Sequence, residues 1–448
     1  MKGDQLPEMV TTIPGPRSTA LAKELRSVEC RAITYIDDSF PVFWEAARGS
    51  NVLDVDGNLY IDASGAFAVS NLGHSADEVV EALQQQAASL LHGMGDVHPS
   101  AAKVEVAKLL DEITPGDLGH AIFGSSGAEA VEAAIKTATL ATGRPGLIAF
   151  EGAYHGLTYG ALAATHRKDF RQPFEDQLGV PVVHLPFPDP YRPPAGSDAS
   201  TCSDFCLQRV RETLESSQQT AAVIIEPIQG RGGEVVPPED FLPGLRKVCD
   251  ESGVLLICDE IFTGFCRTGE WFAADHAGVV PDLMCLGKAL SNGFPVSACV
   301  GRPQVMDAWA ESTGEAIHTS TYLGHPVGCA MGIATIRQMQ RLKLDRTAAE
   351  KGEWLMQELR ALSARHERIG NVRGKGLMVG VELVKDRSSK EPDSELTWKV
   401  VQESLRRGLI LLGGGRRRNV LSISPPLTIA VEQLEFLVDT LDDVLGTT

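Results

Sequence analysis

The sequence predicts an α/β fold built on a mostly parallel sheet. From about residue 76 onward, short runs of apolar and β-branched residues alternate with helical patterns. The clearest runs are Gly146–Phe150, Val182–Leu185, Ala222–Ile225, Val254–Cys258 and Leu283–Leu286. Short buried strands separated by helices are typical of an open parallel sheet. A chain of 448 residues is also long enough for two or three domains.

The regions on either side of this pattern differ from it. Asp56-Gly57 interrupts an alternating segment at 51–62, which predicts a β-hairpin with a tight turn because both residues tolerate a positive φ. Residues 186–204 are rich in Pro, Asp and Ser, so we expect a surface loop. After about residue 330 we expect long helices around one more strand, Leu377–Leu383. The final helix should pack through one apolar stripe: Val431, Leu434, Val438, Leu441 and Leu445.

Composition restricts the partners and the compartment. The net charge is −18 with acidic residues spread along the chain, so the protein's field repels nucleic acids and anionic membranes. The nine cysteines are scattered, odd in number and often inside apolar runs, which is typical of reduced thiols in the cytoplasm. No metal-ligand spacing occurs among cysteines and histidines, and the N-terminus lacks a signal-peptide core. We therefore expect a cytoplasmic protein with no metal, nucleic-acid or membrane partner.

Two carboxylates follow the predicted strand at 254–258. Open α/β sheets bind ligands at the carboxyl ends of their strands, so either Asp259 or Glu260 could face a cofactor. The other would then cap the next helix or form an ion pair. On this segment alone, capping and binding are equally supported.

A lysine follows the predicted strand at 283–286. Burying the ammonium of Lys288 there is costly unless it reaches water, a counter-ion or a covalent partner. Partial desolvation lowers the pKa of a lysine and makes it a nucleophile toward carbonyls. Taken alone, however, a lysine that extends its amine to the surface is the favoured interpretation.

Two further segments have features of a ligand site. In 123–136, Ser126 and Glu129 form a capping box before an alanine-rich helix, whose start presents N–H groups suited to a phosphate. In 151–156, Tyr154 could stack on a flat ligand. A well-capped helix and a core tyrosine are the alternatives. Together the four segments supply a phosphate cradle, a stacking ring, a carboxylate and a lysine, which pyridoxal 5′-phosphate (PLP) requires.

Several long motifs resemble those of the class III (ω-) aminotransferases, which are PLP enzymes of fold type I. The motifs are GSSGAEAVEAAIK, EGAYHG, IIEPIQGRGG, ICDEIFTGFCRTG, LGKALSNGFP, HTSTYLGHP, VRGKGLMVGVEL and SISPPLTI. The resemblance implies a large PLP-binding domain at 76–330 with a seven-stranded, mostly parallel sheet flanked by helices. It also implies a smaller α+β domain from an N-terminal segment (1–75) and residues 331–448, and a homodimer with shared active sites.

The resemblance assigns roles to individual residues. Lys288 corresponds to the lysine that forms a Schiff base with PLP, and Asp259 to the partner of the pyridine nitrogen. The other implied cofactor contacts are Ser126, Gly127 and Ala128 at the phosphate, Tyr154 stacked on the ring, His155, Ile261 on the other face, and Thr321 at the phosphate of the neighbouring subunit. Glu226 and Phe67 are the implied substrate contacts.

The implied reaction moves an amino group from an amine or amino acid to a keto acid by a ping-pong mechanism, with Lys288 moving the Cα proton. Returning that proton to the opposite face of Cα would racemise the substrate, so a racemase or epimerase is the second candidate. A non-catalytic scaffold that kept the fold is the third. The joint presence of Lys288, Asp259, Tyr154 and Thr321 argues against that third candidate.

Two departures from the family concern the cofactor and the substrate. Phe262 stands where many members have a glutamine that hydrogen-bonds the cofactor's phenolic oxygen. Ser422 stands where members that use 2-oxoglutarate place an arginine on the substrate carboxylate, and losing such a contact costs roughly 2–5 kcal/mol. We hypothesise that an arginine of the run 416–418 (Arg416, Arg417, Arg418) turns inward to meet Glu226 or the substrate. An exposed basic loop is the alternative.

The departures also support the racemase alternative. Some members without that arginine, including α-amino-ε-caprolactam racemase, isomerise at Cα, and LPFPDPYRPP and VELVKDRSSKEP resemble segments of that subgroup. The amino donor is not identified by any motif. Trp44, Phe67, Met94 and Phe262 could line an apolar pocket, although such residues are more often core.

Overall fold

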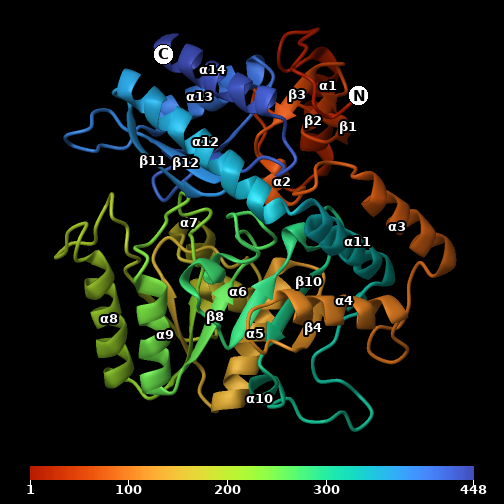
Figure 1. Ribbon diagram of the computed structural model, residues 1–448, viewed down its shortest axis with the longest axis vertical. Coiled ribbons are helices and arrows are strands. Elements are labelled where there is room, and N and C mark those ends of the chain that lie inside the picture. Colours follow the sequence, from red (N-terminus) through yellow and green to blue (C-terminus); the bar gives the residue numbers. More distant parts are fainter. Residues whose placement is uncertain (448) are drawn as a thin grey trace. The chain divides into compact units, whose positions relative to one another are not determined.

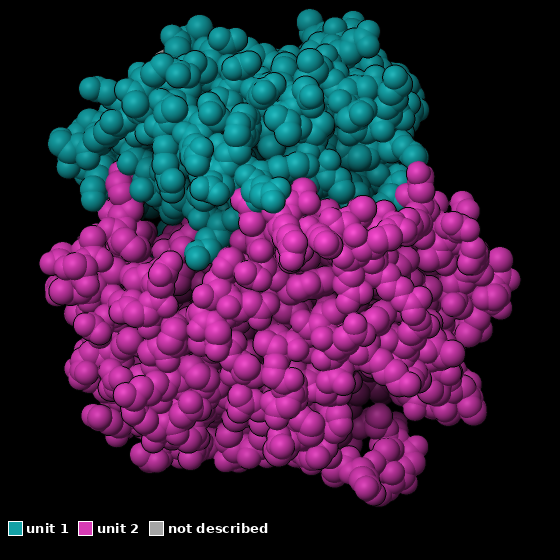
Figure 2. Space-filling view, in the orientation of Figure 1, with its two compact units in different colours: residues 1–76, 350–448 teal, residues 77–349 magenta. Residues whose placement is uncertain are grey.

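The computed structural model describes residues 1–447 and divides into two compact units (Figure 2). Both ends of the chain, residues 1–76 and those from 350 onward, form unit 1, and residues 77–349 form unit 2. The predicted boundary at residue 330 lies inside helix α11 (Pro326–Leu342), which packs within unit 2 against α3 (Asp77–Ser89) and α4 (Ala101–Ile113). The functional division into a PLP-binding domain and a smaller domain stays a prediction.

Unit 2 is built on a seven-stranded sheet (Figure 1). In spatial order the strands are β4 (His120–Gly124), β10 (Ser297–Gly301), β9 (Leu283–Leu286), β8 (Leu255–Asp259), β7 (Thr220–Ile225), β5 (Gly146–Phe150) and β6 (Val182–Leu185). Only β10 runs antiparallel to its neighbours, β4 and β9. The prediction of a mostly parallel sheet is therefore confirmed.

Both faces of this sheet are covered by helices. Along β7, Ile224 packs with α5 (Gly127–Thr142), whereas Val223 and Ile225 pack with α8 (Cys202–Ser216) and α9 (Phe241–Ser252). Successive side chains of a strand point to opposite faces, so a strand buried on both faces is apolar throughout. The other short helical elements of unit 2 are α6 (Tyr159–Ala164), α7 (Lys168–Arg171), η1 (Gln172–Gln177), η2 (Ala273–Ala277), η3 (Lys288–Leu290) and α10 (Pro303–Met306).

Unit 1 contains two four-stranded sheets. One has the order β1 (Trp44–Arg48), β2 (Asn51–Asp54), β3 (Leu59–Asp62) and β13 (Leu409–Ile410). The other has the order β11 (Ile369–Lys375), β12 (Met378–Leu383), β15 (Val420–Ile423) and β14 (Leu412–Gly414). Because β13 pairs with β3, the C-terminal part extends the N-terminal sheet. The expectation of one strand after residue 330 was wrong, since five are present there in the described chain.

The helices of unit 1 are α1 (Pro16–Val28), α2 (Gly65–Ala68), α13 (Ser394–Arg406) and α14 (Val431–Thr447), and α12 (Leu344–Arg365) leads into it from unit 2. Four of the five stripe residues in α14 are buried as predicted: Leu434, Val438, Leu441 and Leu445. Val431 is exposed instead, because it is the first residue of the helix.

Two local predictions need correction. β2 and β3 form the predicted hairpin, but four residues connect them and only Gly57 has a positive φ, of 92°. The carboxylate of Asp56 instead accepts hydrogen bonds from the backbone N–H groups of Arg17 and Ser18, which tie α1 to the loop. Segment 186–204 is not wholly a surface loop, because Phe187 is buried against Phe150 and Phe241, and α8 begins at Cys202.

A left-handed turn follows β3. Gly65, Ala66, Phe67 and Ala68 have φ values of 54°, 49°, 63° and 59°. This conformation costs a non-glycine residue roughly 1–2 kcal/mol. Buried Asp62 offsets part of that cost, because its carboxylate accepts hydrogen bonds from the N–H groups of Ser64 (2.8 Å) and Ala66 (2.9 Å).

The remaining expectations concern thiols and membranes. All nine cysteines are unpaired and eight are buried, which confirms the prediction of free thiols. Among residues 1–447, no helix combines the length and the apolar character needed to cross a membrane.

Candidate active site

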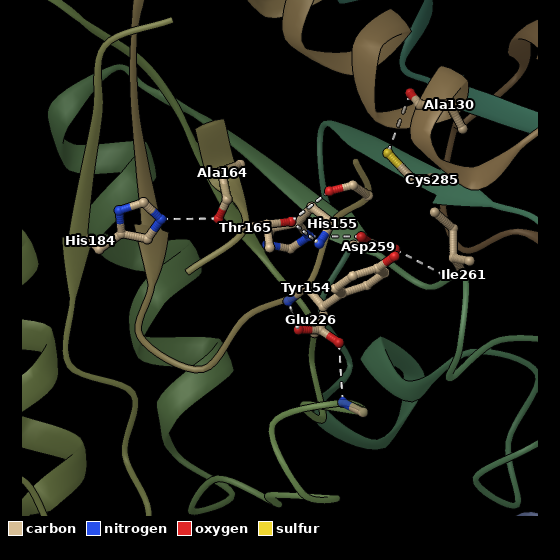
Figure 3. A network of polar contacts seen from close by, with 12 residues as sticks. Ala130, Tyr154, His155, Ala164, Thr165, His184, Glu226, Asp259, Ile261 and Cys285 are labelled. Atoms are coloured by element: carbon tan, nitrogen blue, oxygen red, sulfur yellow. Dashed lines mark hydrogen bonds and ion pairs between the residues drawn. The ribbon is translucent and has the colours of Figure 1, made fainter. Parts of the chain in front are cut away.

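The two carboxylates at the end of β8 have different roles. Glu260 accepts hydrogen bonds from the N–H groups of Ala273 (3.0 Å) and Ala274 (2.8 Å) and from the hydroxyl of Thr263, so it caps η2. Asp259 accepts from the ring of His155 at 2.7 Å and from the N–H of Ile261 at 3.1 Å (Figure 3). Asp259 is therefore the carboxylate available to a ligand.

His155 and Asp259 form a buried ion pair. The backbone N–H of His155 donates to the hydroxyl of Thr165 at 2.9 Å, and that hydroxyl donates to the carbonyl of Gly156 at 2.9 Å, which fixes the loop after β5. Burial alone would lower the pKa of His155, but the hydrogen bond to Asp259 and the charges of Asp259 and Glu226 outweigh it and raise the pKa. The raised pKa favours the charged form of the imidazole, which donates its hydrogen bond to Asp259.

Lys288 lies just after β9 in a strained backbone conformation. Its φ is 42°, in the left-handed region, which costs a lysine about 1–3 kcal/mol and is typical of functional positions. The Nζ atom lies 4.9 Å from the centre of the Phe262 ring. Burial lowers the pKa of Lys288 and the charge of Arg231 adds to that effect, whereas Asp259 and Glu226 oppose it. A lowered pKa makes this amine a nucleophile.

Glu226 is buried at the end of β7. Its carboxylate accepts hydrogen bonds from the N–H groups of Tyr154 (2.9 Å) and Gly230 (3.1 Å). Burial raises its pKa to about 7, and the charge of Asp259 acts in the same direction against that of His155. Glu226 thus joins the loop after β5 to the loop after β7, beside the ion pair (Figure 3).

The start of α5 forms a tight cradle. The hydroxyl of Ser126 accepts from the N–H of Glu129, as predicted, but the carboxylate of Glu129 accepts from the N–H of Ser125 rather than from that of Ser126, so only half of the predicted capping box forms. A Cβ atom at Gly127 would lie 2.8 Å from Ile261 Cδ1, so only glycine lets this backbone approach so closely. The first N–H groups of a helix attract a phosphate through hydrogen bonds and the helix dipole.

These groups match the chemistry of PLP. Lys288 is an amine of lowered pKa for the aldehyde, and Asp259 has two recorded donors within residues 1–447, so it can still accept from a protonated ring nitrogen. The Nε2 atom of His155 is buried with no hydrogen-bond partner in the described chain. The residues present therefore fit the cofactor that the sequence predicts.

The structure brings most of the predicted cofactor contacts together in unit 2, and the other predicted residues are exposed or belong to unit 1. Thr321 is exposed on a surface segment of unit 2. Phe67 and the basic run 416–418 belong to unit 1, where they are exposed. Ser422 also belongs to unit 1, in β15. The proposed apolar residues Trp44 and Met94 are exposed too, at 42% and 53%, and so are not core.

Three more residues shape this site, and of these only Phe262 stood out in the sequence, as a departure from the family. Thr165 holds His155, Phe262 covers the amine of Lys288, and the guanidinium of Arg231 lies 4.8 Å from the centre of the Tyr154 ring. For Arg231 a signal was available, since it is the one cation in the motif IIEPIQGRGG and has glycines on both sides. The contact of Thr165 carries no local sequence signal.

Comparisons with known proteins agree with this geometry. The family model for aminotransferase class III matches residues 34–445. A 4-aminobutyrate aminotransferase of Mycobacterium leprae (strain TN) is 38% identical over 99% of each chain. An alanine/serine racemase of Pyrococcus horikoshii is 35% identical over 99% of this chain and 94% of its own. The crystal structure of the ω-transaminase from Pseudomonas jessenii in complex with PMP has a TM-score of 0.90 and 27% identity, covering 95% of this chain and 98% of that one.

The fold and the site therefore define a PLP enzyme of fold type I. The chain belongs to the class III aminotransferases, which depend on PLP.

Proposed function

We propose that this protein transfers amino groups from an amine or amino acid to a keto acid, with PLP held covalently by Lys288. The observation that carries the proposal is the meeting of three groups in unit 2: the amine of Lys288, the Asp259–His155 ion pair and the open start of α5. The 4-aminobutyrate aminotransferase among the relatives supports an amino-acid donor.

Each residue has a distinct task in this proposal. Bound PLP supplies an electron sink that stabilises negative charge at the substrate Cα. Asp259 would hold a proton on the ring nitrogen, and the hydrogen bond from His155 orients that carboxylate. Ser126, Gly127 and Ala128 would hold the phosphate, with Tyr154 and Ile261 against the ring. Lys288 would take up the Cα proton and return it.

The test follows the bond between the amine and the cofactor. The purified protein should have a visible absorbance that borohydride removes, with the cofactor fixed to Lys288 in peptide mapping. Lys288→Ala should abolish both the adduct and turnover, whereas Lys247→Ala, at a lysine exposed by 71%, should retain both. A wild-type protein that stays colourless after addition of PLP would contradict the proposal and support a scaffold.

A racemase or epimerase is the second candidate, because Ser422 replaces the usual arginine and one close relative is an alanine/serine racemase. Incubation of amino acids in deuterated water, with and without pyruvate or 2-oxoglutarate, distinguishes the two. Transamination requires the acceptor and yields a keto acid. Loss of chirality with deuterium uptake and no acceptor requirement would identify the racemase.

We also propose a homodimer, supported by an exposed apolar surface around Thr321. Its residues are Leu90, Leu91, Met94, Val97, Val104, Ile317 and Tyr322, exposed by 42–74%. The two segments that carry them contact each other, since Thr319 donates to Asp96 at 2.6 Å and the rings of His92 and Tyr322 lie 5.4 Å apart. Apolar patches of this kind are typical of protein interfaces.

Light scattering tests the homodimer. A double substitution, Val97→Glu with Ile317→Glu, should convert a dimer to monomers because it buries two charges at the interface. Val28→Glu, at a valine of unit 1 that is exposed by 83%, should leave the dimer intact. A wild-type monomer would contradict the proposal. We further propose a cytoplasmic location, which the eight buried free thiols support.

A further inference from the structure

An arginine that the proposed mechanism does not use lies over the ring of Tyr154. The guanidinium of Arg231 stands 4.8 Å from the centre of the Tyr154 ring and 5.8 Å from that of Phe170. The two rings are 6.0 Å apart at 69°, so they form a corner that restricts the guanidinium. Stacking of this kind orders an arginine while its N–H groups stay available to an anion.

The backbone that carries Arg231 is fixed from both sides. A Cβ at Gly230 would lie 3.2 Å from the Phe262 ring, and a Cβ at Gly232 would lie 2.6 Å from the Gln229 side chain. Gln229 exchanges backbone hydrogen bonds with Val235, and its side-chain amide donates to the carbonyl of Glu151 at 2.9 Å. These contacts hold the backbone around Arg231 in one conformation.

Arg231 is electrostatically linked to the reacting amine and has no acidic partner. Its charge lowers the pKa of Lys288, which places it within range of the site. No carboxylate among residues 1–447 forms a recorded ion pair or hydrogen bond with it. Glu226 is engaged by two backbone N–H groups, from Tyr154 and Gly230. The fork of donors on Arg231 therefore remains available to a ligand anion.

The substrate of an aminotransferase that accepts amino acids and keto acids carries such an anion. Ser422 offers no positive charge at the position where the family resemblance implies an arginine. The arginines at 416–418 are exposed within unit 1, with side chains at the surface of that unit. Arg231 is the cation that the structure of unit 2 places beside Tyr154.

We propose that Arg231 binds the carboxylate of the amino-acid and keto-acid substrates and so takes over the role that Ser422 cannot fill. The inference rests on the proposed function and deepens it, since it assigns the enzyme to carboxylate-bearing substrates rather than simple amines. One face of the Tyr154 ring then orders the guanidinium, which leaves the other face for the flat cofactor.

The experiment compares acids with amines that differ only in the carboxylate. Dissociation constants of alanine, ethylamine, 4-aminobutyrate and propylamine are measured on the holoenzyme by titration of its visible absorbance. For the wild type, at least one acid should bind more tightly than its matched amine. Arg231→Gln should weaken that acid by about 10- to 100-fold, the range for a hydrogen bond to a charged group, and leave the amine within about twofold.

Three further variants complete the experiment. Arg231→Lys should recover part of the affinity, because it keeps the charge and loses the bidentate fork. Arg192→Gln removes an arginine that lies 5.3 Å from the ring centre of Tyr191, and should change neither class of ligand. The triple change of Arg416, Arg417 and Arg418 to Gln tests the competing basic run and should leave acid binding unchanged.

The outcomes separate this inference from the proposed function. Four results would each overturn the role of Arg231. The first two are an equal loss of affinity for acid and amine in Arg231→Gln, or no loss for either. The other two are a wild type that does not prefer an acid, or a loss of acid binding only in the triple variant. In all of these cases a coloured, borohydride-sensitive wild type that transaminates would still support the proposed function. A colourless protein would instead contradict the proposed function itself.

Discussion

Each unit contains one buried pair of aspartate and histidine, and the two pairs differ in how fully the aspartate is satisfied. In unit 1, Asp62 and His74 Nε2 are 2.8 Å apart, and in unit 2, Asp259 and His155 Nδ1 are 2.7 Å apart. Asp62 has three further hydrogen bonds, from the N–H and hydroxyl of Ser64 and the N–H of Ala66. Asp259 has one, from the N–H of Ile261.

The difference distinguishes a structural carboxylate from a binding one. A carboxylate can accept about four hydrogen bonds, so Asp62 has no acceptor capacity left for a ligand. Its hydrogen bonds stabilise the left-handed turn. Asp259 retains acceptor capacity in a buried position, which is costly for a group that serves only the fold. An incompletely satisfied buried ion pair is therefore the better indicator of a ligand site than an ion pair as such.

The largest expected effect is on catalysis. Asp259→Asn should lower turnover by at least about 10³-fold, because a neutral amide cannot hold a protonated ring nitrogen. Steady-state kinetics at saturating PLP measures this effect. The same change at Asp62 should leave turnover per folded, cofactor-loaded molecule within about tenfold of the wild type. Equal losses at both positions would remove the distinction between the two pairs.

The next effect is on stability. Asp62→Asn should lower the free energy of unfolding by about 3 kcal/mol, since it leaves a buried histidine and a strained turn without their anion. Urea unfolding of the apoprotein, followed by circular dichroism, provides the measurement. Asp38→Asn, at an aspartate of unit 1 that lies outside the pair, is a control that should change stability by less than about 0.5 kcal/mol.

The two pairs should also lose their stabilising effect at opposite ends of the pH range. Burial alone would raise the pKa of Asp62, but hydrogen bonds from His74 and Ser64 outweigh burial and lower it. The ionised carboxylate therefore contributes to folding stability above pH 4, and this contribution is lost as the pH falls through the pKa of the folded state. The raised pKa of His155 gives a contribution that is complete below pH 6.5 and lost as the pH rises through the folded value. Unfolding of Asp62→Asn and His155→Gln from pH 3 to 9 tests this, and parallel profiles would contradict it.

The smallest expected effect is on the pKa of His155 in unit 2. Glu226, with a pKa of about 7, contributes to the raised pKa of His155. Glu226→Gln should therefore lower the pKa of His155, which nitrogen-15 NMR of labelled histidine can follow. Glu239→Gln, at an exposed glutamate, should leave it unchanged. An unshifted His155 in the Glu226 variant would show that the two groups are not coupled.

The central sheet could be predicted because its strands have local signatures. Gly146–Phe150 and Leu283–Leu286 match β5 and β9, since strands buried on both faces are continuously apolar, and Val182–Leu185 matches β6 at the edge of the sheet. In unit 1, β12 is buried throughout and was predicted as Leu377–Leu383, but the short strands β13 and β14 lack that signature. β14 reads Leu-Gly-Gly and β13 has two residues, and both depend on pairing with distant partners.

The site was predictable in its components and not in its pairings. Lys288 stands out in the sequence because burying an ammonium at the end of a strand is costly unless a partner compensates its charge. The choice between Asp259 and Glu260 depends on the face to which the end of β8 turns, which the sequence leaves open. The His155–Asp259 bond joins residues 104 positions apart, and no local pattern encodes it. The left-handed turn at 65–68 was missed because only Gly65 favours that conformation.

The distribution of thiols provides a practical route to labelling. Cys30, just after α1 in unit 1, is the exposed one of nine cysteines. The others are buried, and burial raises the pKa of Cys206, Cys249 and Cys329 to about 12, so few of those thiols ionise. A maleimide dye should therefore attach to the native protein at one residue, Cys30. That fluorophore would report on the surroundings of the segment after α1, with no cysteine removed.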